Sequence, residues 1–92
     1  MKLECKVAIV TGTSPNIGCG IAGGLADEGA KVVCMDVMAD NATQCADGIK
    51  PRGGDALGIA CDVTDEAQVE AMVARARDSY GGVDILVNAA GI

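Results

Sequence analysis

The stretch VTGTSPNIGCGIA, residues 10–22, decides how the fold of this chain is interpreted. It follows the apolar run VAIV (7–10), which predicts a buried strand, and it leads into a segment with helical spacing of apolar residues. A glycine-rich turn between a strand and a helix places free backbone N–H groups at the positive end of the helix dipole, where a phosphate can bind. Tight packing of helix on strand also explains such a turn. The rest of the chain must therefore separate the two interpretations.

Four short apolar runs alternate with three amphipathic segments along the chain. The predicted strands cover residues 7–10, 31–36, 56–62 and 83–88. The predicted helices cover residues 17–28, 40–50 and 65–80. Continuously apolar strands are typical of a sheet that is covered on both faces. The order β-α-β-α-β-α-β with right-handed crossovers therefore predicts an α/β fold, a parallel sheet with helices on both faces.

Several helix ends carry recognisable signals. Gly29 follows the first helix as a stop, Asp65 and Gln68 have the spacing of a capping box, and Gly81 stands at a predicted C-cap. The first helix also contains four glycines, at positions 18, 20, 23 and 24. Each costs about 0.5–1 kcal/mol relative to alanine inside a helix, so we expect close backbone approach as the reason for them.

Composition excludes several classes of function. The 92 residues suit one domain at most, and 7 basic against 13 acidic groups give a net charge of −6. Such a surface repels phosphate backbones and anionic lipids, so neither nucleic acid nor membrane is expected as a partner. Without histidine, the chain cannot build a His-based triad or a His metal ligand.

The five cysteines show no CxxC pair, so no metal site is expected. Their odd number and the lack of a signal-peptide-like apolar segment predict reduced thiols in a soluble, cytoplasmic protein. They are Cys5, Cys19, Cys34, Cys45 and Cys61.

Asp36 ends the second predicted strand, 18 residues after Gly18. In dinucleotide-binding folds an acidic residue here accepts hydrogen bonds from the adenosine ribose hydroxyls. Its carboxylate would also repel the 2′-phosphate of NADP, and the loop GTSPNIG (12–18) has no Arg or Lys to offset it, which favours NAD. A solvated strand-end carboxylate or a helix cap is the alternative. Methyltransferases that use S-adenosylmethionine also carry such a loop and such acidic residues, with Asp62 as the third, so the cofactor stays open at this point.

Three motifs carry a family resemblance. TGTSPNIG (11–18), CDVTD (61–65) and GGVDILVNAAG (81–91) resemble, in the same order, the glycine turn, the adenine-contacting stretch and the strand-4 loop of the short-chain dehydrogenase/reductase family. Methyltransferases lack the leading Thr-Gly and the terminal NAAG. The resemblance covers nearly the whole chain, and it implies a Rossmann-type sheet in strand order 3-2-1-4, with the cofactor crevice between strands 1 and 4.

The resemblance also implies which residues bind the cofactor. Asp36 would hold the adenosine ribose, and Asp62 and Val63 the adenine edge. The diphosphate and adjoining ribose would be lined by Gly12, Ser14, Ile17 and Gly18, and the central ribose by Asn88, Ala89, Ala90 and Gly91. Asn88 has a compatible structural role, since this asparagine often braces the central sheet.

Two departures from the family pattern affect the glycine loop. Asn16 stands where the family has its middle glycine, and Pro15 precedes it. Asparagine tolerates positive φ, so the turn can survive, and its amide is a possible substitute donor to the phosphate. Pro15 removes one N–H donor but stiffens the loop. Ala89 replaces the second asparagine of the motif, a mild change in a loop that needs small residues.

The family's catalytic serine and Tyr-x-x-x-Lys helix are not found in these 92 residues. Tyr80 has Asp84 four positions later and is better explained as a packing residue at a helix end. We therefore expect residues 1–92 to be the N-terminal part of a single dinucleotide-binding domain, with no catalytic residue and no activity by themselves.

For the intact protein the resemblance implies an NAD-dependent oxidoreductase. It would transfer hydride to or from a small alcohol or carbonyl substrate and assemble as a tetramer or dimer. The alternative is that the chain is complete as given and forms a non-catalytic, nucleotide-binding or self-associating module.

Overall fold

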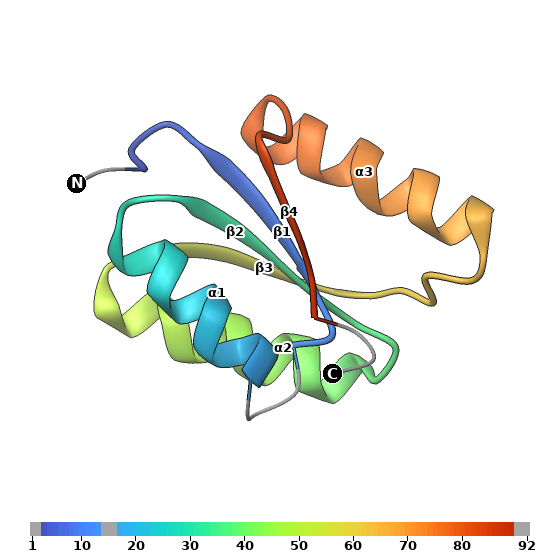
Figure 1. Cartoon of the computed structure of the whole chain (residues 1–92), viewed down its shortest axis with the longest axis horizontal. Coiled ribbons are helices and arrows are strands. Elements are labelled where there is room, and N and C mark those ends of the chain that lie inside the picture. Colours follow the sequence, from blue (N-terminus) through green and yellow to red (C-terminus); the bar gives the residue numbers. More distant parts are fainter. Residues whose placement is uncertain (1–2, 14–16, 90–92) are drawn as a thin grey trace.

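Four parallel strands form a sheet between three α-helices in the computed structural model (Figure 1), which describes residues 3–13 and 17–89. The elements in chain order are β1 (Val7–Thr11), α1 (Ile17–Asp27), β2 (Lys31–Asp36), α2 (Ala39–Ile49), the 3-10 turn η1 (Lys50–Arg52), β3 (Asp55–Ala60), α3 (Glu66–Tyr80) and β4 (Ile85–Asn88). No helix in these ranges is long and apolar enough to cross a membrane.

The strand order is β3-β2-β1-β4, which confirms the predicted order 3-2-1-4. All three strand pairs are parallel, with Val7 opposite Lys31, Ala8 opposite Ile85, and Lys31 opposite Asp55 at their first paired positions. The predicted alternation of four strands and three helices is thus confirmed. β2 and β3 extend the sheet on one side of β1, and β4 is added on the other side.

Two of the predicted strand ends are off by two residues. β4 begins at Ile85 rather than at residue 83, and its pairing with β1 starts at Ala8 opposite Ile85. Just before it, the Asp84 N–H donates to the Val7 carbonyl at 2.8 Å, while the Val7 N–H donates to the Asp84 carboxylate at 2.9 Å. β3 ends at Ala60, and just beyond it the N–H of Cys61 bonds back to the sheet, at the Asp36 carbonyl oxygen 3.0 Å away.

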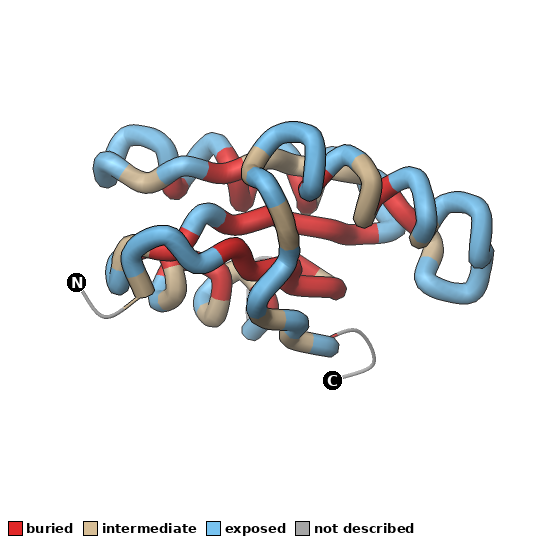
Figure 2. Tube along the Cα trace, turned by 90° about the horizontal axis from the view of Figure 1, so that it is seen from above, coloured by how far each residue is buried: buried red, intermediate tan, exposed pale blue. Residues whose placement is uncertain are grey.

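Helices cover both faces of the sheet, and each face has its own apolar core. Figure 2 shows the buried residues along the strands and on the helix sides that face them. Val10, Val32 and Cys34 point to the α1 and α2 side. Ile9, Val33 and Met35 point to the α3 side. This alternation explains why the strand sequences are apolar at every position.

Apolar side chains beside β4, on the face that α3 covers, are exposed to solvent. Leu86 is 66% exposed, beside the partly exposed Val63 and Val83. They border an apolar groove of about 300 Å³ between β4 and α3. Its lining comprises Ile9, Thr11, Val63, Val69, Met72, Val73, Val83, Leu86 and Asn88.

The ends of α3 follow the sequence signals with one difference. Asp65 accepts hydrogen bonds from the backbone N–H groups of Ala67 and Gln68, and Gly81 caps the other end with φ 89°. Gln68, however, does not bond to the Asp65 N–H, as a capping box requires, because that N–H already donates to the Asp62 carbonyl. Instead the Gln68 side-chain oxygen accepts from the Asp62 N–H at 2.9 Å. The helix start is thereby tied to the end of β3.

The expected close backbone approach holds for Gly18 among the four α1 glycines, whereas at Gly23 the near neighbour is the end of a side chain. A Cβ on Gly18 would stand 1.8 Å from the Gly12 carbonyl oxygen, and one on Gly23 would stand 3.0 Å from the Arg52 guanidinium. The explanation is wrong for Gly20 and Gly24 within the described residues, since nothing there lies within 4 Å of either added Cβ.

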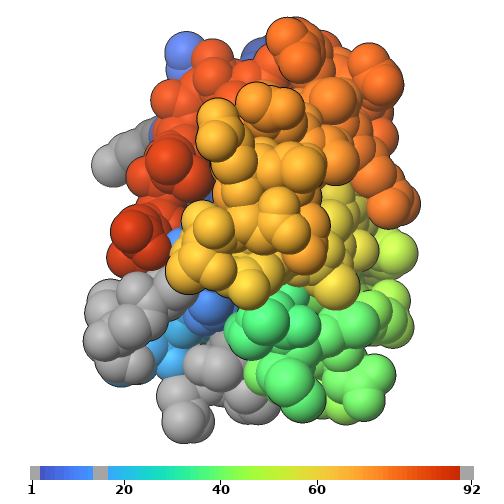
Figure 3. All heavy atoms as spheres, turned by 90° about the vertical axis from the view of Figure 1, so that its right-hand side faces the viewer, coloured from blue at the N-terminus to red at the C-terminus, as the bar shows by residue number. Residues whose placement is uncertain are grey.

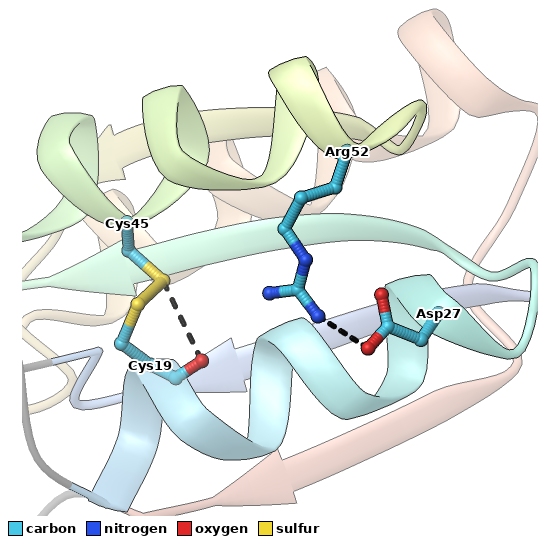
Figure 4. Close-up of polar contacts among 4 residues, drawn as sticks. All are labelled: Cys19, Asp27, Cys45 and Arg52. Carbon is cyan, nitrogen blue, oxygen red and sulfur yellow. Dashed lines mark hydrogen bonds and ion pairs between the residues drawn. A yellow bond between two sulfur atoms is a disulfide. The ribbon is translucent and has the colours of Figure 1, made fainter.

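The expectation of five reduced thiols is contradicted by a disulfide between Cys19 of α1 and Cys45 of α2 (Figure 4). Their Cα atoms are 5.6 Å apart, a separation that suits a disulfide. The sequence could not reveal this pair, because the two cysteines are 26 positions apart and meet only once α1 and α2 lie on the same face. Cys5, Cys34 and Cys61 are free.

Packing of α2 on β3 predicts opposite effects at two glycines. A Cβ on Gly58 would stand 2.8 Å from the Ala42 carbonyl oxygen, so Gly58→Ala should lower the free energy of unfolding by about 1–3 kcal/mol. Gly48→Ala, on the open side of α2, should raise it by about 0.5–1 kcal/mol. Urea unfolding measures both. Equal effects of the two substitutions would show that α2 does not press on β3 as described.

The disulfide predicts a stability that depends on redox conditions. Closing a loop of 26 residues restricts the unfolded chain, so full reduction should lower the free energy of unfolding by about 3 kcal/mol. Cys5→Ser should leave the oxidised protein unchanged, because Cys5 is exposed and free. Unfolding curves with and without a phosphine reductant test this. Identical curves would contradict a contribution of the disulfide to stability.

Candidate functional site

The candidate site lies where β1 and β4 end side by side. The helix that follows β1 packs on one face of the sheet, and the helix that precedes β4 packs on the other. A crevice at the carboxyl ends of the strands is expected at such a point, and ligands of open α/β sheets bind there. Figure 3 looks onto this edge of the molecule and shows the segment after β3 beside the start of α2.

The turn after β1 lets the first turn of α1 lie directly against the backbone of Gly12. Gly12 has φ 71°, a left-handed conformation that favours glycine. The buried Thr13 fixes the turn to β2, since its N–H and its hydroxyl both donate to the Met35 carbonyl oxygen, at 3.1 and 3.2 Å. Gly18, in the first turn of α1, lies against Gly12. The amino end of α1, with Ile17 exposed, is thus held at the carboxyl edge of the sheet.

Asp36 is the last residue of β2 and only 7% exposed. Its Oδ1 accepts a hydrogen bond from the Met38 N–H at 2.8 Å, which ties the carboxylate to the turn that leads into α2. The alternative structural role as a local cap is therefore present in the molecule. A carboxylate has about four acceptor positions, so this one bond leaves capacity for ribose hydroxyls.

Asp62 and Val63 follow β3 on the same edge. Asp62 Oδ1 accepts from the hydroxyl of Thr64 at 2.7 Å and from its N–H at 2.9 Å. These hydrogen bonds, the hydroxyl first, lower the pKa of Asp62, so the side chain is an anion at neutral pH. Val63 is half exposed next to it and presents an apolar surface.

Asn88 closes the site from β4. Its Oδ1 accepts a hydrogen bond from the Thr11 hydroxyl at 2.9 Å, and the N–H of the buried Ala89 donates to the Thr11 carbonyl at 3.2 Å. Asn88 thus braces β4 to β1 through the Thr11 side-chain hydroxyl, in keeping with the structural role expected from the sequence. Sequence reasoning gave no role to Thr11 or Thr13. A polar residue at the end of an otherwise apolar strand was the signal that could have singled out Thr11, whereas Thr13 lies in the turn and carries no such signal.

Part of the predicted site lies outside the described residues, namely Ser14, Asn16, Ala90 and Gly91. The described members come together on one edge of the sheet: Gly12, Ile17, Gly18, Asp36, Asp62, Val63, Asn88 and Ala89.

Tyr80 is far from this edge, as its interpretation as a packing residue requires. Its hydroxyl donates to Asp55 Oδ1 at 2.8 Å, and Lys31 Nζ lies 5.6 Å from the centre of its ring. Both partners begin strands, at the amino edge of the sheet. Burial and the bond to Asp55 raise the pKa of Tyr80, so it stays protonated.

Comparison with known proteins supports the same architecture. The family profile described as short chain dehydrogenase matches residues 6–92. The chain belongs to the short-chain dehydrogenase family. Membership implies a nicotinamide cofactor and removes the S-adenosylmethionine alternative. In the described ranges, no cluster of three or more potential metal-ligating side chains occurs.

Individual relatives of this short-chain dehydrogenase chain are enzymes by name. Galactitol 2-dehydrogenase of Agrobacterium fabrum is 45% identical over 92 residues, which are all of this chain and 35% of that protein. The 7alpha-hydroxysteroid dehydrogenase of Escherichia coli K12 is 43% identical over 91 residues, 99% of this chain and 36% of that protein.

A solved structure agrees in fold. The crystal structure of a hydroxysteroid dehydrogenase from Escherichia coli superposes with a TM-score of 0.91 at 42% identity, covering 95% of this chain and 37% of that one. The chain thus spans about a third of the length of the relatives it matches.

The hydrogen bonds of Asp62 predict a measurable titration. The pKa of Asp62 in the folded protein lies below its usual value of 3.8. The Thr64 hydrogen bonds therefore stabilise the folded protein at pH values above 3.8, the pKa of Asp62 in the unfolded chain. This contribution to the free energy of unfolding is lost as the pH falls through the lower pKa of the folded protein. Thr64→Val removes the hydroxyl donor and should raise the Asp62 pKa toward 3.8, whereas Thr43→Val on α2 should not. Carboxyl-carbon NMR titration measures this, and an unmoved Asp62 midpoint in Thr64→Val would refute the assignment.

Proposed function

We propose that this chain is the dinucleotide-binding part of an NAD-dependent dehydrogenase or reductase that acts on a small alcohol or carbonyl compound. The observation that carries the proposal is the Gly12–Gly18 contact, which holds the amino end of α1 beside the crevice at the ends of β1 and β4. Backbone N–H groups at a helix start are suited to a diphosphate. In a chain with net charge −6, such local donors are the way to hold an anion.

Each described residue of the site has a part in the proposal. Asp36 accepts from the adenosine ribose, Asp62 and Val63 border the adenine, and Asn88 and Ala89 border the central ribose. Gly12, Ile17 and Gly18 line the diphosphate, and the proposal extends along the sequence to Ser14, Asn16, Ala90 and Gly91. The bound nicotinamide ring supplies the hydride donor or acceptor. The residues of this chain bind and orient the dinucleotide.

NAD rather than NADP is proposed because of Asp36. An NADP molecule would bring its 2′-phosphate to the ribose hydroxyl that this carboxylate is placed to contact. The carboxylate and the 2′-phosphate are both anions and would repel each other. Because the Asp36 side chain is only 7% exposed, little solvent would screen this repulsion. Arg52 is the described arginine closest in sequence, and it is already paired with Asp27.

We propose that the residues that transfer protons in the reaction lie outside residues 1–92. Tyr80 bonds to Asp55 at the opposite edge of the sheet and lacks a lysine four positions later. The relatives' greater length supports this division, since 92 residues cover about 35% of them. The proposal therefore places residues 1–92 in a larger dinucleotide-binding domain. It also takes the intact protein to be a cytoplasmic homo-oligomer, a tetramer or dimer.

The alternative, a non-catalytic self-associating module, is not favoured by the named dehydrogenase relatives and rests on the apolar groove alone. Leu86 of β4 is exposed, and the exposed Val63 and Val83 line the same groove beside it; β4 is an edge strand of the described sheet. Exposed apolar edges favour association. Intact mass separates the candidates: a mass near 9.2 kDa with a defined dimer favours the module, and a mass of about three times that value favours the dehydrogenase.

Asp36 provides the sharpest test of the proposal. Asp36→Asn keeps an oxygen for the Met38 N–H but removes the charge, so NAD binding should weaken by about 1.5–3 kcal/mol, roughly tenfold to 150-fold. The preference for NAD over NADP should shrink as well. Titration calorimetry on the full-length protein measures both affinities. Asp40→Asn, an exposed residue in the first turn of α2, is the matched control. Unchanged NAD affinity in Asp36→Asn removes Asp36 from the site.

A further inference from the structure

Helices α1 and α2 lie on the same face of the sheet and are tied together near both ends of α1 (Figure 4). At its carboxyl end, Asp27 pairs with Arg52 of η1, and the Arg52 guanidinium also packs against Gly23. At its amino end, the Cys19–Cys45 disulfide is the tie. The first of these is an exposed ion pair, which is weak, and the second is covalent and can be broken only by reduction.

We propose that Cys19 and Cys45 form a thiol–disulfide redox site that controls dinucleotide binding, with the oxidised form binding more tightly. The inference rests on the proposed function, because the controlled ligand is NAD.

The position of the disulfide couples it to the crevice. Cys19 directly follows Gly18, the residue that presses on Gly12 at the start of α1. Cys45 lies in α2, the helix whose entry turn is tied to the Asp36 carboxylate. The bond therefore joins the element that would hold the diphosphate to the element that follows the ribose-binding carboxylate. Asp36 itself lies within the loop that the disulfide closes.

The two sulfur atoms differ in access. Cys19 is half-buried, whereas Cys45 is 3% exposed. An external thiolate therefore reaches the Cys19 sulfur first, and Cys45 is the leaving group. In the reduced state the Cys45 thiol has an acceptor at hand, since its sulfur lies 3.9 Å from the Cys19 carbonyl oxygen.

The two buried free cysteines, Cys34 and Cys61, do not compete for this exchange. Burial raises the pKa of Cys34 to about 11. Burial, with the nearby carboxylates of Asp62 and Asp65, also raises the pKa of Cys61. Thiols with raised pKa values are poor nucleophiles at neutral pH. Both are also buried, and neither is paired.

The redox step balances with a dithiol as reductant. One thiolate of the dithiol attacks Cys19 Sγ, the Cys19–Cys45 bond breaks, and Cys45 leaves as a thiolate that takes up a proton. The second thiol of the reductant then attacks its own mixed disulfide and releases Cys19, which is protonated in turn. Two electrons and two protons pass to the protein, and the dithiol becomes a cyclic disulfide. Glutathione disulfide drives the reverse reaction and leaves as two glutathione thiols.

Oxidation favours binding through preorganisation. The crosslink fixes the first turn of α1 against α2 before the dinucleotide arrives, so less conformational freedom is lost on binding. Linkage then requires a reciprocal effect, in which bound NAD shifts the thiol–disulfide equilibrium toward the disulfide by the same factor. Couplings between sites typically change affinity by a factor of about 5 to 150, so we expect at least fivefold here.

The test combines two measurements on the full-length protein. The first is NAD affinity by titration calorimetry, for the protein oxidised with glutathione disulfide and for the protein reduced with dithiothreitol. Cys19→Ser/Cys45→Ser and Cys19→Ala/Cys45→Val are permanently uncrosslinked forms, and circular dichroism selects the one that is folded. Cys5→Ser is the control that keeps the pair. The second is the fraction of Cys19 and Cys45 alkylated across a series of glutathione buffers, with and without NAD, read by mass spectrometry.

We expect NAD to bind the oxidised protein and Cys5→Ser at least fivefold more tightly than the reduced and uncrosslinked forms. Saturating NAD should shift the alkylation midpoint by the same factor. Equal NAD affinity of both forms, with no shift of the midpoint, overturns the redox site but leaves the proposed function standing. Full alkylation of Cys19 and Cys45 in every buffer overturns it as well. Absence of NAD binding in all forms overturns the proposed function and the inference together.

Discussion

The carbonyl oxygen of Gly12 stands 1.8 Å from where a side-chain carbon of residue 18 would lie, and the rest of the candidate site depends on this contact. It requires glycine at position 18 and lets α1 begin directly against the turn that ends β1. The positive end of the helix dipole is thereby held at the carboxyl edge of the sheet. A longer loop or a larger residue would move those N–H groups away from the crevice, and the acidic chain has few other means of holding a diphosphate.

Hydrogen bonds at the strand ends complete the same edge. Thr13 ties the β1 turn to β2, and Thr11 ties β1 to Asn88 of β4. The Asp36 carboxylate belongs to the turn before α2, and its carbonyl accepts from Cys61. Asp36 and Asn88, which are proposed to contact the cofactor, are thus also among the residues that hold the strand ends together. A site built this way is preformed, which lowers the cost of binding.

The sequence predicted the order of elements and the strand order, because apolar runs and helical spacing are local signals and the family motifs fixed the topology. Signals such as Asp65 before α3 depend on a few neighbouring residues, so they were found correctly. Contacts between distant residues were not found. Thr11 meets Asn88 across 77 positions, and Cys19 meets Cys45 only because two helices share a face. No local pattern encodes such pairs.

Backbone amide NMR of the full-length protein during titration with NAD shows whether the dinucleotide binds at the start of α1. We predict that the N–H signals of Gly12, Gly18 and Asp36 shift together and saturate at one NAD concentration, while those of Lys31 and Asp55 at the amino edge of the sheet stay in place. Shifts confined to the amino edge, or no shifts at Gly12 and Gly18 at saturating NAD, would contradict a dinucleotide site at the start of α1.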